Sequence, residues 1–423
     1  MRLANERRLI FLKTETPDMP TEKPMWRQNL VVLWFGTFMA GLAFSEIMPF
    51  LSLYVDTLGN FSKTELNLYS GITFSATYLV TAIASPIWGK LADSKGRKVM
   101  LLRASLGMSF IMALMGLVTS VWQLMALRFI QGIFSGYISN ANALMATQVP
   151  KQKSGQALGT LATGYVGGSL FGPLLGGILA EVFSYRVTFF ITGALLLSVF
   201  FLSYFFVHEK FTPVEKADML STNEVVKVLR NPKLILGMFV TTLIIQASNN
   251  SISPILALFV RQIMPAGSPV TFYSGIVAAV PGVATLFAAP RLGRLGDKFG
   301  TELVLSVGFI FAIIVYIPMA FVTNVWMLIV LRFLIGISNA TMLPAVQTLL
   351  SKNTPAEVTG RVFSYNQSFQ AVGNVLGPLI GSFVSNTFDY RAVFISTSIL
   401  VLLNFTMVWF NTKSMRKKHL DQI

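Results

Sequence analysis

The sequence predicts an all-α membrane protein with twelve transmembrane helices in two six-helix pseudo-repeats, and three observations predict this fold class. Of the 423 residues, 53% are hydrophobic and 12% are charged, whereas an ordinary soluble domain carries about 25% charged residues. Twelve stretches are long and apolar enough to cross a bilayer. Landmarks of the first half of the chain recur in the second half.

A helix needs about 20 mostly apolar residues to cross the hydrocarbon core of a membrane. The predicted spans are 29–55, 68–90, 99–119, 122–147, 157–181, 187–207, 234–260, 271–290, 302–322, 324–349, 361–387 and 391–411. Residues 1–28 form a polar cytoplasmic arm before the first span. The first span lacks the small-residue cleavage pattern of a secretory signal. We therefore expect a retained first helix.

Lysine and arginine predict the orientation, because these residues concentrate in cytoplasmic loops. Of the 33 basic residues, 27 fall in the two terminal segments and in every second loop. The alternate loops hold only Lys63, Arg186, Arg261 and Arg391. Both termini are therefore expected in the cytoplasm. The net charge of +15 is explained by this topology, so we expect no nucleic-acid partner.

The predicted spans divide the chain into two bundles of six, over residues 29–207 and 234–411. Residues 208–233 join them as a cytoplasmic linker of mixed charge, with an interfacial helix near Asn223–Arg230 as the alternative to a simple solvated connector. Residues 412–423 form a cytoplasmic tail. We expect a monomer in the bilayer.

Enzyme and cofactor classes find no support in the sequence. The chain has no cysteine and two histidines, which excludes disulfides and leaves little for a metal site. It contains no phosphate-binding loop and no catalytic triad. We therefore expect no enzyme activity, no metal and no cofactor, and the energy for any transport must come from an ion gradient.

An internal repeat supports two equivalent bundles. The recurring pairs are Gly89–Asp93 with Gly293–Asp297, Leu127–Phe129 with Leu331–Phe333, Gly172–Leu174 with Gly377–Leu379, and Tyr185–Arg186 with Tyr390–Arg391, at offsets of 204 or 205 residues. Parallel repeats of six helices joined by a cytoplasmic loop are the architecture of secondary transporters, whose halves rock around a central site.

Three motifs carry a family resemblance. Residues 89–98 resemble the signature loop of the major facilitator superfamily, residues 124–132 resemble its fourth-helix motif, and residues 168–177 resemble the fifth-helix motif of its drug:proton antiporters. Four longer stretches, 140–150, 239–246, 343–350 and 363–369, resemble the MdtG-type multidrug resistance efflux proteins of bacteria. The resemblance covers about residues 25–412. It implies the major facilitator fold, a location in the bacterial cytoplasmic membrane, and drugs and protons as transported partners.

The loop between the second and third spans is short, basic and glycine-rich. Gly89 and Gly96 permit close helix approach and left-handed backbone conformations. The resemblance implies that Asp93 and Arg97 act as a latch that holds the cytoplasmic side closed, with Asp297 as a second copy. The alternative is that the basic residues serve only as topology signals.

Arg128 lies inside an apolar span, where a cation costs at least ~2.5–3.5 kcal/mol unless it faces protein or water. The resemblance implies a part in proton transfer, through a hydrogen-bond network with Gln131. The alternative is an arginine that pins the helix near its extracellular start.

Glu46 is the acid that lies furthest inside a predicted span. A carboxyl group in a low-dielectric environment binds a proton more readily, so Glu46 is the candidate proton carrier or cation-binding group. The alternative is an acid of the outer vestibule without a coupling role.

The fifth span places Gly168, Gly172 and Gly176 at four-residue spacing around Pro173. This spacing puts the glycines on one stripe, where another helix packs closely. The resemblance implies a bending, leak-proof seam between the halves, and plain close packing is the alternative.

The substrate cavity is expected to be apolar with a few polar groups, because amides facing lipid are costly. The candidate cavity residues are Phe38, Asn140, Asn142, Gln246, Asn249, Asn250, Tyr365, Asn366 and Gln370. Amides that only join helices are the alternative.

The sequence thus predicts a secondary active transporter that exports structurally varied amphipathic compounds or antibiotics in exchange for protons by alternating access. The alternatives are a narrow-specificity transporter of a metabolite or sugar, and a transporter-like sensor that binds its ligand without turnover.

Overall fold

The computed structural model describes residues 25–150, 153–209, 211, 228, 229, 231–355 and 358–413, and over these residues the chain is helical without strands. In the first half the helices are α2 (Met25–Ser45), α3 (Leu51–Asp56), α4 (Lys63–Lys95), α5 (Arg97–Met115), α6 (Val121–Phe134), α7 (Tyr137–Gln148), α8 (Ser154–Val182) and α9 (Tyr185–Phe206). In the second half they are α11 (Pro232–Ser251), α12 (Ser253–Ile263), α13 (Val270–Phe299), α14 (Thr301–Met319), α15 (Val325–Asn353), α16 (Thr359–Thr387) and α17 (Tyr390–Asn411).

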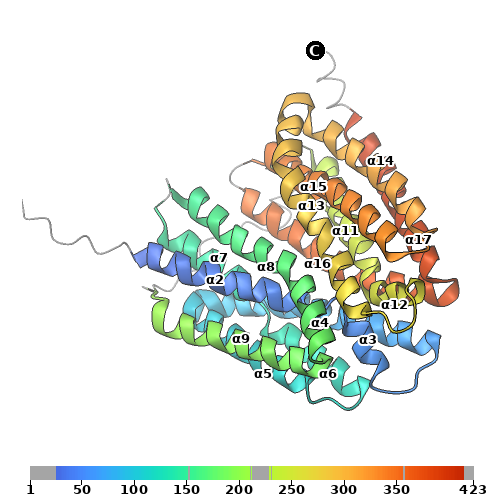
Figure 1. Cartoon of the computed structure of the whole chain (residues 1–423). Coiled ribbons are helices and arrows are strands. Elements are labelled where there is room, and N and C mark those ends of the chain that lie inside the picture. Colours follow the sequence, from blue (N-terminus) through green and yellow to red (C-terminus); the bar gives the residue numbers. More distant parts are fainter. Residues whose placement is uncertain are drawn as a thin grey trace, which may run out of the picture.

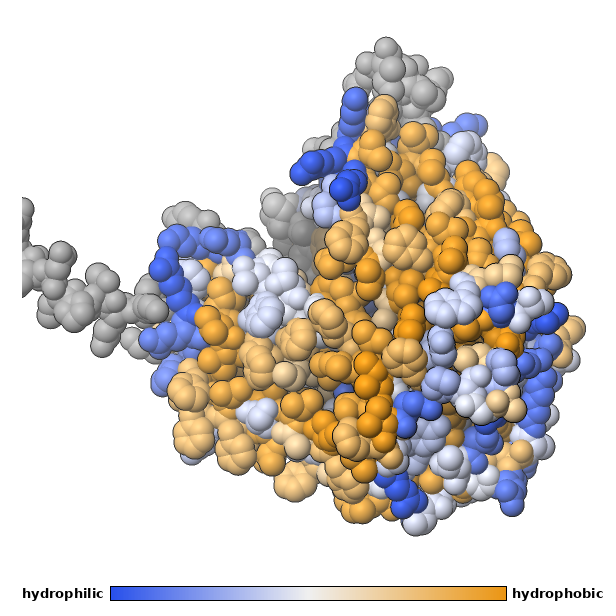
Figure 2. Space-filling model, in the orientation of Figure 1, coloured by the Kyte–Doolittle hydropathy of each residue, from blue (hydrophilic) through white to orange (hydrophobic). Residues whose placement is uncertain are grey.

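All twelve predicted spans correspond to helical segments, so the predicted fold class is confirmed. Nine segments of the described chain are long and apolar enough to cross a membrane by length and composition alone. Figure 2 shows apolar side chains over much of the surface of both halves, with polar residues gathered at their ends. An apolar surface of this extent is the one that a lipid environment requires.

The helices form two bundles that diverge from a common end. In the first bundle α2 packs on α8 and α5 on α9, and in the second α11 packs on α16 and α13 on α15. The bundles meet through α4 with α16 and through α8 with α13. Figure 1 shows them joined near α3, α4 and α12 and separated toward the start of α2 and the start of α14.

The internal repeat is visible in the hydrogen bonds. The Nε of Arg128 donates to the carbonyl oxygen of Thr73 at 3.0 Å, and the Nε of Arg332 donates to that of Val277 at 3.3 Å. The members of each pair are 55 residues apart. Equivalent residues therefore make equivalent contacts in the two halves.

Three predicted spans are interrupted, which the sequence analysis did not anticipate. Residues 46–50 form turns between α2 and α3, and Ile252 separates α11 from α12. The fourth span breaks between α6 and α7, where Gly136 has a φ of 107°, a conformation that glycine adopts readily. Hydropathy detects apolar length but carries no information on these breaks.

The break between α6 and α7 is held by Arg103 of α5. Its guanidinium donates to the carbonyl oxygens of Ile133 at 3.1 Å and Ser135 at 2.6 Å, and it lies 3.8 Å from the ring centre of Trp88. These carbonyls lie at the end of a helix and have lost their usual donors. The positive charge of Arg103 therefore stabilises the end of α6 at the break.

Candidate functional site

One end of the molecule, which we call the closed end, joins the two halves through ion pairs. Arg261 of α12 contacts Asp56 of α3 at 2.6 Å, and Lys63 of α4 contacts Asp389 at 3.1 Å. The hydroxyl of Ser52 donates to the carbonyl oxygen of Pro254 at 2.6 Å. The two halves are therefore linked by charged and neutral contacts at this end.

Close helix crossings lie behind these contacts. A Cβ atom added to Gly177 of α8 would lie 3.1 Å from the Cα of Gly275 of α13. On the other side of the molecule, the hydroxyl of Ser382 of α16 donates to the carbonyl oxygen of Asn67 of α4, and that of Ser75 donates to the carbonyl oxygen of Val375 at 2.8 Å. Backbone therefore approaches backbone between the two halves at this end.

The start of α4 at the closed end carries a capping box. The backbone N–H and the hydroxyl of Ser62 both donate to the carboxylate of Glu65, at 2.9 Å and 2.8 Å. The backbone hydrogen bond, followed by the hydroxyl, lowers the pKa of Glu65, because both donors favour the charged carboxylate. The cap fixes the helix that carries Lys63 of the ion pair.

The opposite end, which we call the open end, separates the halves. A Cβ atom added to Gly89 of α4, Gly159 of α8 or Gly293 of α13 would meet no atom within 4 Å. The space-filling view shows polar residues on the two separated tips (Figure 2). The helices that touch at the closed end therefore part before they reach this end.

Glu46 lies in the turn after α2 and is completely buried. Neither carboxylate oxygen has a hydrogen-bond partner among the described residues. Its backbone packs against α8, because a Cβ atom added to Gly176 would overlap the Glu46 carbonyl oxygen. A charge without a partner in such a place costs several kcal/mol, so this conformation accommodates the neutral acid.

The glycine stripe of α8 faces α2. Added Cβ atoms would overlap the carbonyl oxygen of Phe38 at Gly168 and the hydroxyl of Ser45 at Gly172. The stripe therefore packs within the first half. The contact with the second half is made instead by Gly177 and by the carbonyl oxygen of Pro173, which would lie 2.6 Å from a Cβ atom on Gly275.

Arg128 is buried and joins α6 to α4. Its Nη1 donates to the side-chain oxygen of Gln131 at 2.6 Å, in addition to the Nε bond to Thr73. The hydroxyl of Thr77 donates to the carbonyl oxygen of Arg128 at 2.9 Å. The predicted pair of Arg128 and Gln131 is thus in direct contact. Thr73 and Thr77 complete the network, and no sequence motif had singled them out.

The loop between α4 and α5 contains Gly96 with a φ of 94°, and the equivalent Gly300 has a φ of 99°. The carboxylate of Glu209, which follows α9, accepts the backbone N–H groups of Arg97 at 2.9 Å and Lys98 at 2.8 Å. A carboxylate is favourable at the start of a helix. The side chains of Asp93 and Asp297 lie outside the described part of the structure.

Sequence analysis missed Glu209. The signal lay in its position, because the end of the sixth span and the basic loop before the third span are on the same predicted side of the membrane.

A second polar contact lies next to Glu209. Asn29 donates to the side chain of Gln148 at 2.6 Å and to the carbonyl oxygen of His208 at 2.7 Å. The beginning of the linker is therefore fastened to the first half.

Aromatic side chains line parts of α2 and α8, and of α11 and α16. The ring of Phe38 stacks on Trp34 at 5.8 Å and lies 6.5 Å from Phe171, which is exposed. In the second half the ring of Phe239 lies 5.3 Å from that of Phe369. Adaptable aromatic surfaces of this kind suit apolar ligands.

The predicted cavity amides occupy different environments. The side chain of Asn140 donates to the Gly136 carbonyl oxygen at 2.7 Å, and that of Asn366 accepts from Thr242 at 2.8 Å. Asn250 donates at 3.0 Å to Asn374, a partner that the sequence analysis did not name. Asn142 is exposed, whereas Gln246, Asn249, Tyr365 and Gln370 are partly buried.

Comparison with known proteins agrees with the fold. The family model of the Major Facilitator Superfamily matches residues 33–274 and 238–422. The multidrug resistance protein MdtG of Salmonella typhimurium is 52% identical over 402 residues, which cover 95% of this chain and 99% of that protein. The protein of the same name from Salmonella heidelberg shows the same identity and coverage.

Solved structures share the architecture at low identity. A bacterial homolog to the human lysosomal transporter Spinster, in an inward-facing and unoccupied conformation, has a TM-score of 0.76 and 16% identity, covering 94% of this chain and 98% of its own. The nucleoside transporter NupG has a TM-score of 0.75 and 11% identity, covering 92% and 99%. At these identities the likeness concerns the fold alone.

Proposed function

The chain belongs to the Major Facilitator Superfamily, and from this premise we propose that it exports structurally varied amphipathic compounds from the bacterial cytoplasm in exchange for protons. The observation that carries the proposal is the 52% identity, over nearly the whole chain, to proteins named for multidrug resistance. The structure is closed at one end and open at the other. Such a structure is one state of an alternating-access cycle, which supports a role in transport.

We assign the open end to the cytoplasm. Gly89 of α4 and Gly293 of α13 lie at this end, shortly before the connections that carry an excess of basic residues, and such connections remain cytoplasmic. The ion pairs of the closed end then face outward. In this state a compound enters between the halves from the cytoplasm or from the inner leaflet, and it leaves after the open end closes and the closed end opens.

Aromatic and amide side chains of both halves support this substrate class. The aromatic side chains of Phe38 and Phe171 in the first half and of Phe369 in the second, which keep part of their surface accessible, offer apolar contacts without a fixed hydrogen-bonding pattern. Amides such as Asn250 and Asn374 add a few polar groups. Surfaces that combine apolar area with sparse polar groups accept varied amphipathic molecules, because little specificity is built into each contact.

Protons couple to this cycle through Glu46. When the closed end opens, Glu46 meets water and external protons. Protonation removes the cost of burying a charge, so the protonated state favours closure of that end and return to the state described here. Arg128 and Gln131 connect α6 to α4 and transmit the rearrangement, because both helices belong to the moving first half.

Dye accumulation in cells tests this function. Cells that express the wild type are expected to exclude several unrelated cationic dyes, and a protonophore is expected to abolish the exclusion. Glu46→Gln is expected to abolish it as well, because an amide cannot carry the proton. Glu65→Gln is the matched control, because this exposed acid lies at the same end and glutamine preserves a capping box.

Each outcome separates one alternative. Exclusion that depends on the proton gradient but survives Glu46→Gln supports efflux and removes Glu46 from the coupling. Exclusion of a single compound supports a narrow-specificity transporter. Ligand binding by the purified protein without movement into proteoliposomes supports a sensor and contradicts the proposal.

A further inference from the structure

The two helix crossings that join the halves at the closed end are built from equivalent residues. Gly71 of α4 packs against Ser382 of α16, and Gly275 of α13 packs against Gly177 of α8. Gly71 is equivalent to Gly275 at the offset of 204 residues, and Gly177 is equivalent to Ser382 at the offset of 205. The scaffold is therefore the same in both crossings, and a difference in their polar groups stands out against it.

The crossing of α8 with α13 is bridged by a carboxylate. Glu181 of α8 accepts the backbone N–H of Thr271 of α13 at 3.1 Å. In the crossing of α4 with α16, Asn67 is equivalent to Thr271 and Asn386 is equivalent to Glu181. Two amides therefore occupy positions whose counterparts in the other crossing are in direct contact.

These amides lack hydrogen-bond partners. Asn67 is completely buried, and neither its side-chain nitrogen nor its side-chain oxygen has a partner among the described residues. The same is true of the hydroxyl of Ser70, which is also completely buried, and of the side-chain oxygen of Asn386. Most buried polar atoms in proteins bond to a protein group or to ordered water. The unpaired atoms of these three residues therefore point to a bound polar molecule.

Asn67 and Ser70 face the inside of the molecule. The hydroxyl of Ser75 donates to a backbone carbonyl of α16 at 2.8 Å, and that of Thr77 donates to one of α6 at 2.9 Å. At 3.6 residues per turn, Asn67 and Ser70 project between these two contact faces of α4. Ile83, which is 64% exposed, projects on the opposite side. Because Asn67 and Ser70 are three residues apart, their side chains are neighbours on the helix surface.

Asn386 approaches Asn67 from the other helix. The hydroxyl of Ser382 donates to the carbonyl oxygen of Asn67, and Asn386 lies one turn of α16 further toward the closed end. Side chains lean toward the beginning of their own helix. Because α4 begins at the closed end and α16 ends there, the side chain of Asn67 leans toward the level of Asn386, and that of Asn386 leans back. The two amides therefore converge within the crossing.

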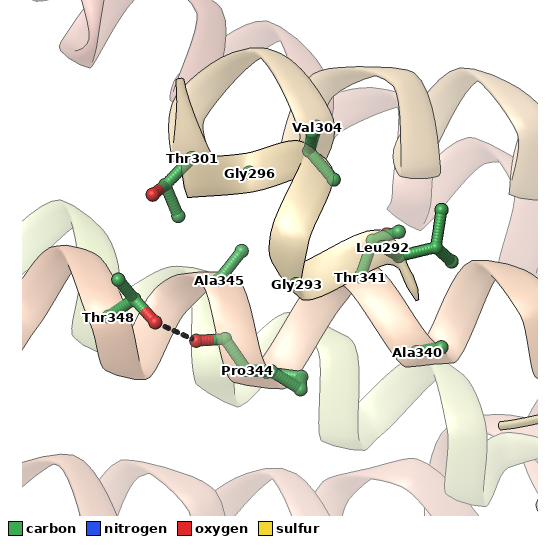
Figure 3. A pocket seen from close by; sticks show the side chains of 10 residues that line it. All are labelled: Leu292, Gly293, Gly296, Thr301, Val304, Ala340, Thr341, Pro344, Ala345 and Thr348. Atoms are coloured by element: carbon green, nitrogen blue, oxygen red, sulfur yellow. Dashed lines mark hydrogen bonds between the residues drawn. The ribbon is translucent and has the colours of Figure 1, made fainter. Parts of the chain in front are cut away.

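The pocket between α13, α14 and α15 at the open end differs in this respect (Figure 3). The hydroxyls of Thr341 and Thr348, which line it, donate to carbonyl oxygens of the preceding turn of α15 at 2.8 Å and 2.9 Å. The hydroxyl of Thr301 accepts from the Nζ of Lys352 at 3.4 Å. The threonine hydroxyls of this pocket already have protein partners, so they do not call for a bound ligand.

We propose that the crossing of α4 with α16 binds water inside the closed end, held by Asn67, Ser70 and Asn386. Water fits a place enclosed between two helices, and it both donates and accepts, as the amide nitrogen and the amide oxygens require. A buried water makes about three hydrogen bonds, and three side chains converge here. The closed end is thus bridged by a carboxylate along one crossing and by hydrated amides along the other.

Radiolytic labelling of the purified full chain tests for this water, because hydroxyl radicals formed from a bound water oxidise the side chains beside it. Phe74 is the reporter, since it lies one turn after Ser70 and is 3% exposed. We expect oxidation of Phe74 in the wild type, and a severalfold lower rate in Ser70→Ala and Asn67→Leu. Ser274→Ala is the matched control at the equivalent position of α13, and it is expected to leave the rate unchanged.

Thermal unfolding of Asn67→Leu and Asn386→Leu, alone and together, gives a second measurement. If the amides share a water, each substitution lowers the unfolding temperature, and the double variant loses less than the sum of the two. If the amides have no partner, leucine removes a buried unpaired polar group, so each substitution raises the unfolding temperature. Asn386→Leu with Thr271→Val, whose residues lie in different crossings, is the control for which the effects should add.

Each outcome supports or overturns the water site. Oxidation of Phe74 that depends on Asn67 and Ser70, with a non-additive double variant, supports it. A wild-type Phe74 that resists oxidation, or stabilisation by both leucine substitutions, overturns it. Coupling of the two amides that appears only with a transported dye present assigns them to the exported compound and also overturns it. Neither readout requires efflux, so absence of dye efflux by the wild type contradicts the proposed function and leaves this inference in place.

Discussion

The two halves of this transporter share a scaffold but differ in the polar groups they bury. Gly168 and Gly373 occupy equivalent crossings, where added Cβ atoms would overlap the carbonyl oxygens of Phe38 and Leu243. The first half buries the carboxyl group of Glu46, whereas the equivalent position of the second half holds Ser251, which bonds to Thr397 at 2.9 Å. Glycine packing therefore maintains the repeat, whereas the buried acid without a hydrogen-bond partner that the described residues contain, Glu46, lies in the first half.

The arginine networks show the same asymmetry. Arg128 donates to both Thr73 and Gln131 and is buried, whereas Arg332 makes a longer bond to Val277 and is partly exposed. Ile335 stands at the position equivalent to Gln131. The second half keeps the arginine but lacks the glutamine side chain that orients the guanidinium group in the first half. We infer that the first half carries the groups that couple transport to protons.

The largest difference is expected between Arg128→Leu and Arg332→Leu. The first removes two hydrogen bonds from a charged group, each worth about 1.5–3 kcal/mol, and leaves Gln131 without its main donor. We expect a marked fall in thermal stability and loss of efflux for Arg128→Leu, and a smaller fall for Arg332→Leu. Equal losses in thermal unfolding of the two purified variants would contradict the asymmetry.

Glu209→Ala tests whether the linker fastens the first half at the open end. The carboxylate accepts two backbone N–H groups at the start of α5, and loss of a helix cap costs about 1 kcal/mol. We expect a lower unfolding temperature and faster proteolysis near residue 96. His208→Ala is the matched control, because its backbone, and not its side chain, bonds to Asn29. Similar effects of both variants would contradict the claim that the Glu209 side chain fastens the linker to the start of α5.

The ion pairs between the halves are expected to have a smaller effect. Exposed pairs contribute about 0.2–1 kcal/mol each, so Arg261→Gln with Lys63→Gln, which removes both pairs, should increase opening of the closed end roughly two- to thirtyfold. Labelling of Ser70→Cys, a buried position at this end, by an impermeant maleimide measures the opening. Added salt should accelerate labelling when the pairs are present and not when they are absent.

The smallest effect is expected at the start of α4. The lowered pKa of Glu65 means that its stabilisation is complete above the ordinary carboxyl pKa, and it is lost as the pH falls through the lowered value. The start of α13 has no side-chain cap. Hydrogen exchange at the start of α4 should therefore become faster as the pH falls, with no matching change in α13. Glu65→Ala should make this exchange fast at every pH and remove its pH dependence. A pH dependence that survives Glu65→Ala points to another acid.

The sequence predicted the spans and the repeat because both depend on apolar length and on recurring residues. It paired Arg128 with Gln131 correctly, since three residues on a helix bring side chains to neighbouring positions. It did not locate the break at Gly136 or the contact of Arg103 with the free carbonyls, because a single glycine in an apolar run has many explanations. Glu209 was missed because its partners are backbone groups, which leave no trace in the residue types.

Proton movement in proteoliposomes tests the central claim most directly. A drug gradient imposed across vesicles of purified wild-type protein should drive a proton flux in the opposite direction, reported by a trapped pH-sensitive dye. The account predicts that Glu46→Gln still binds the drug and loses the drug-driven proton flux, whereas Ser251→Ala at the equivalent position retains it. An unchanged proton flux per drug molecule in Glu46→Gln would contradict the claim that the first half couples transport to protons through this acid.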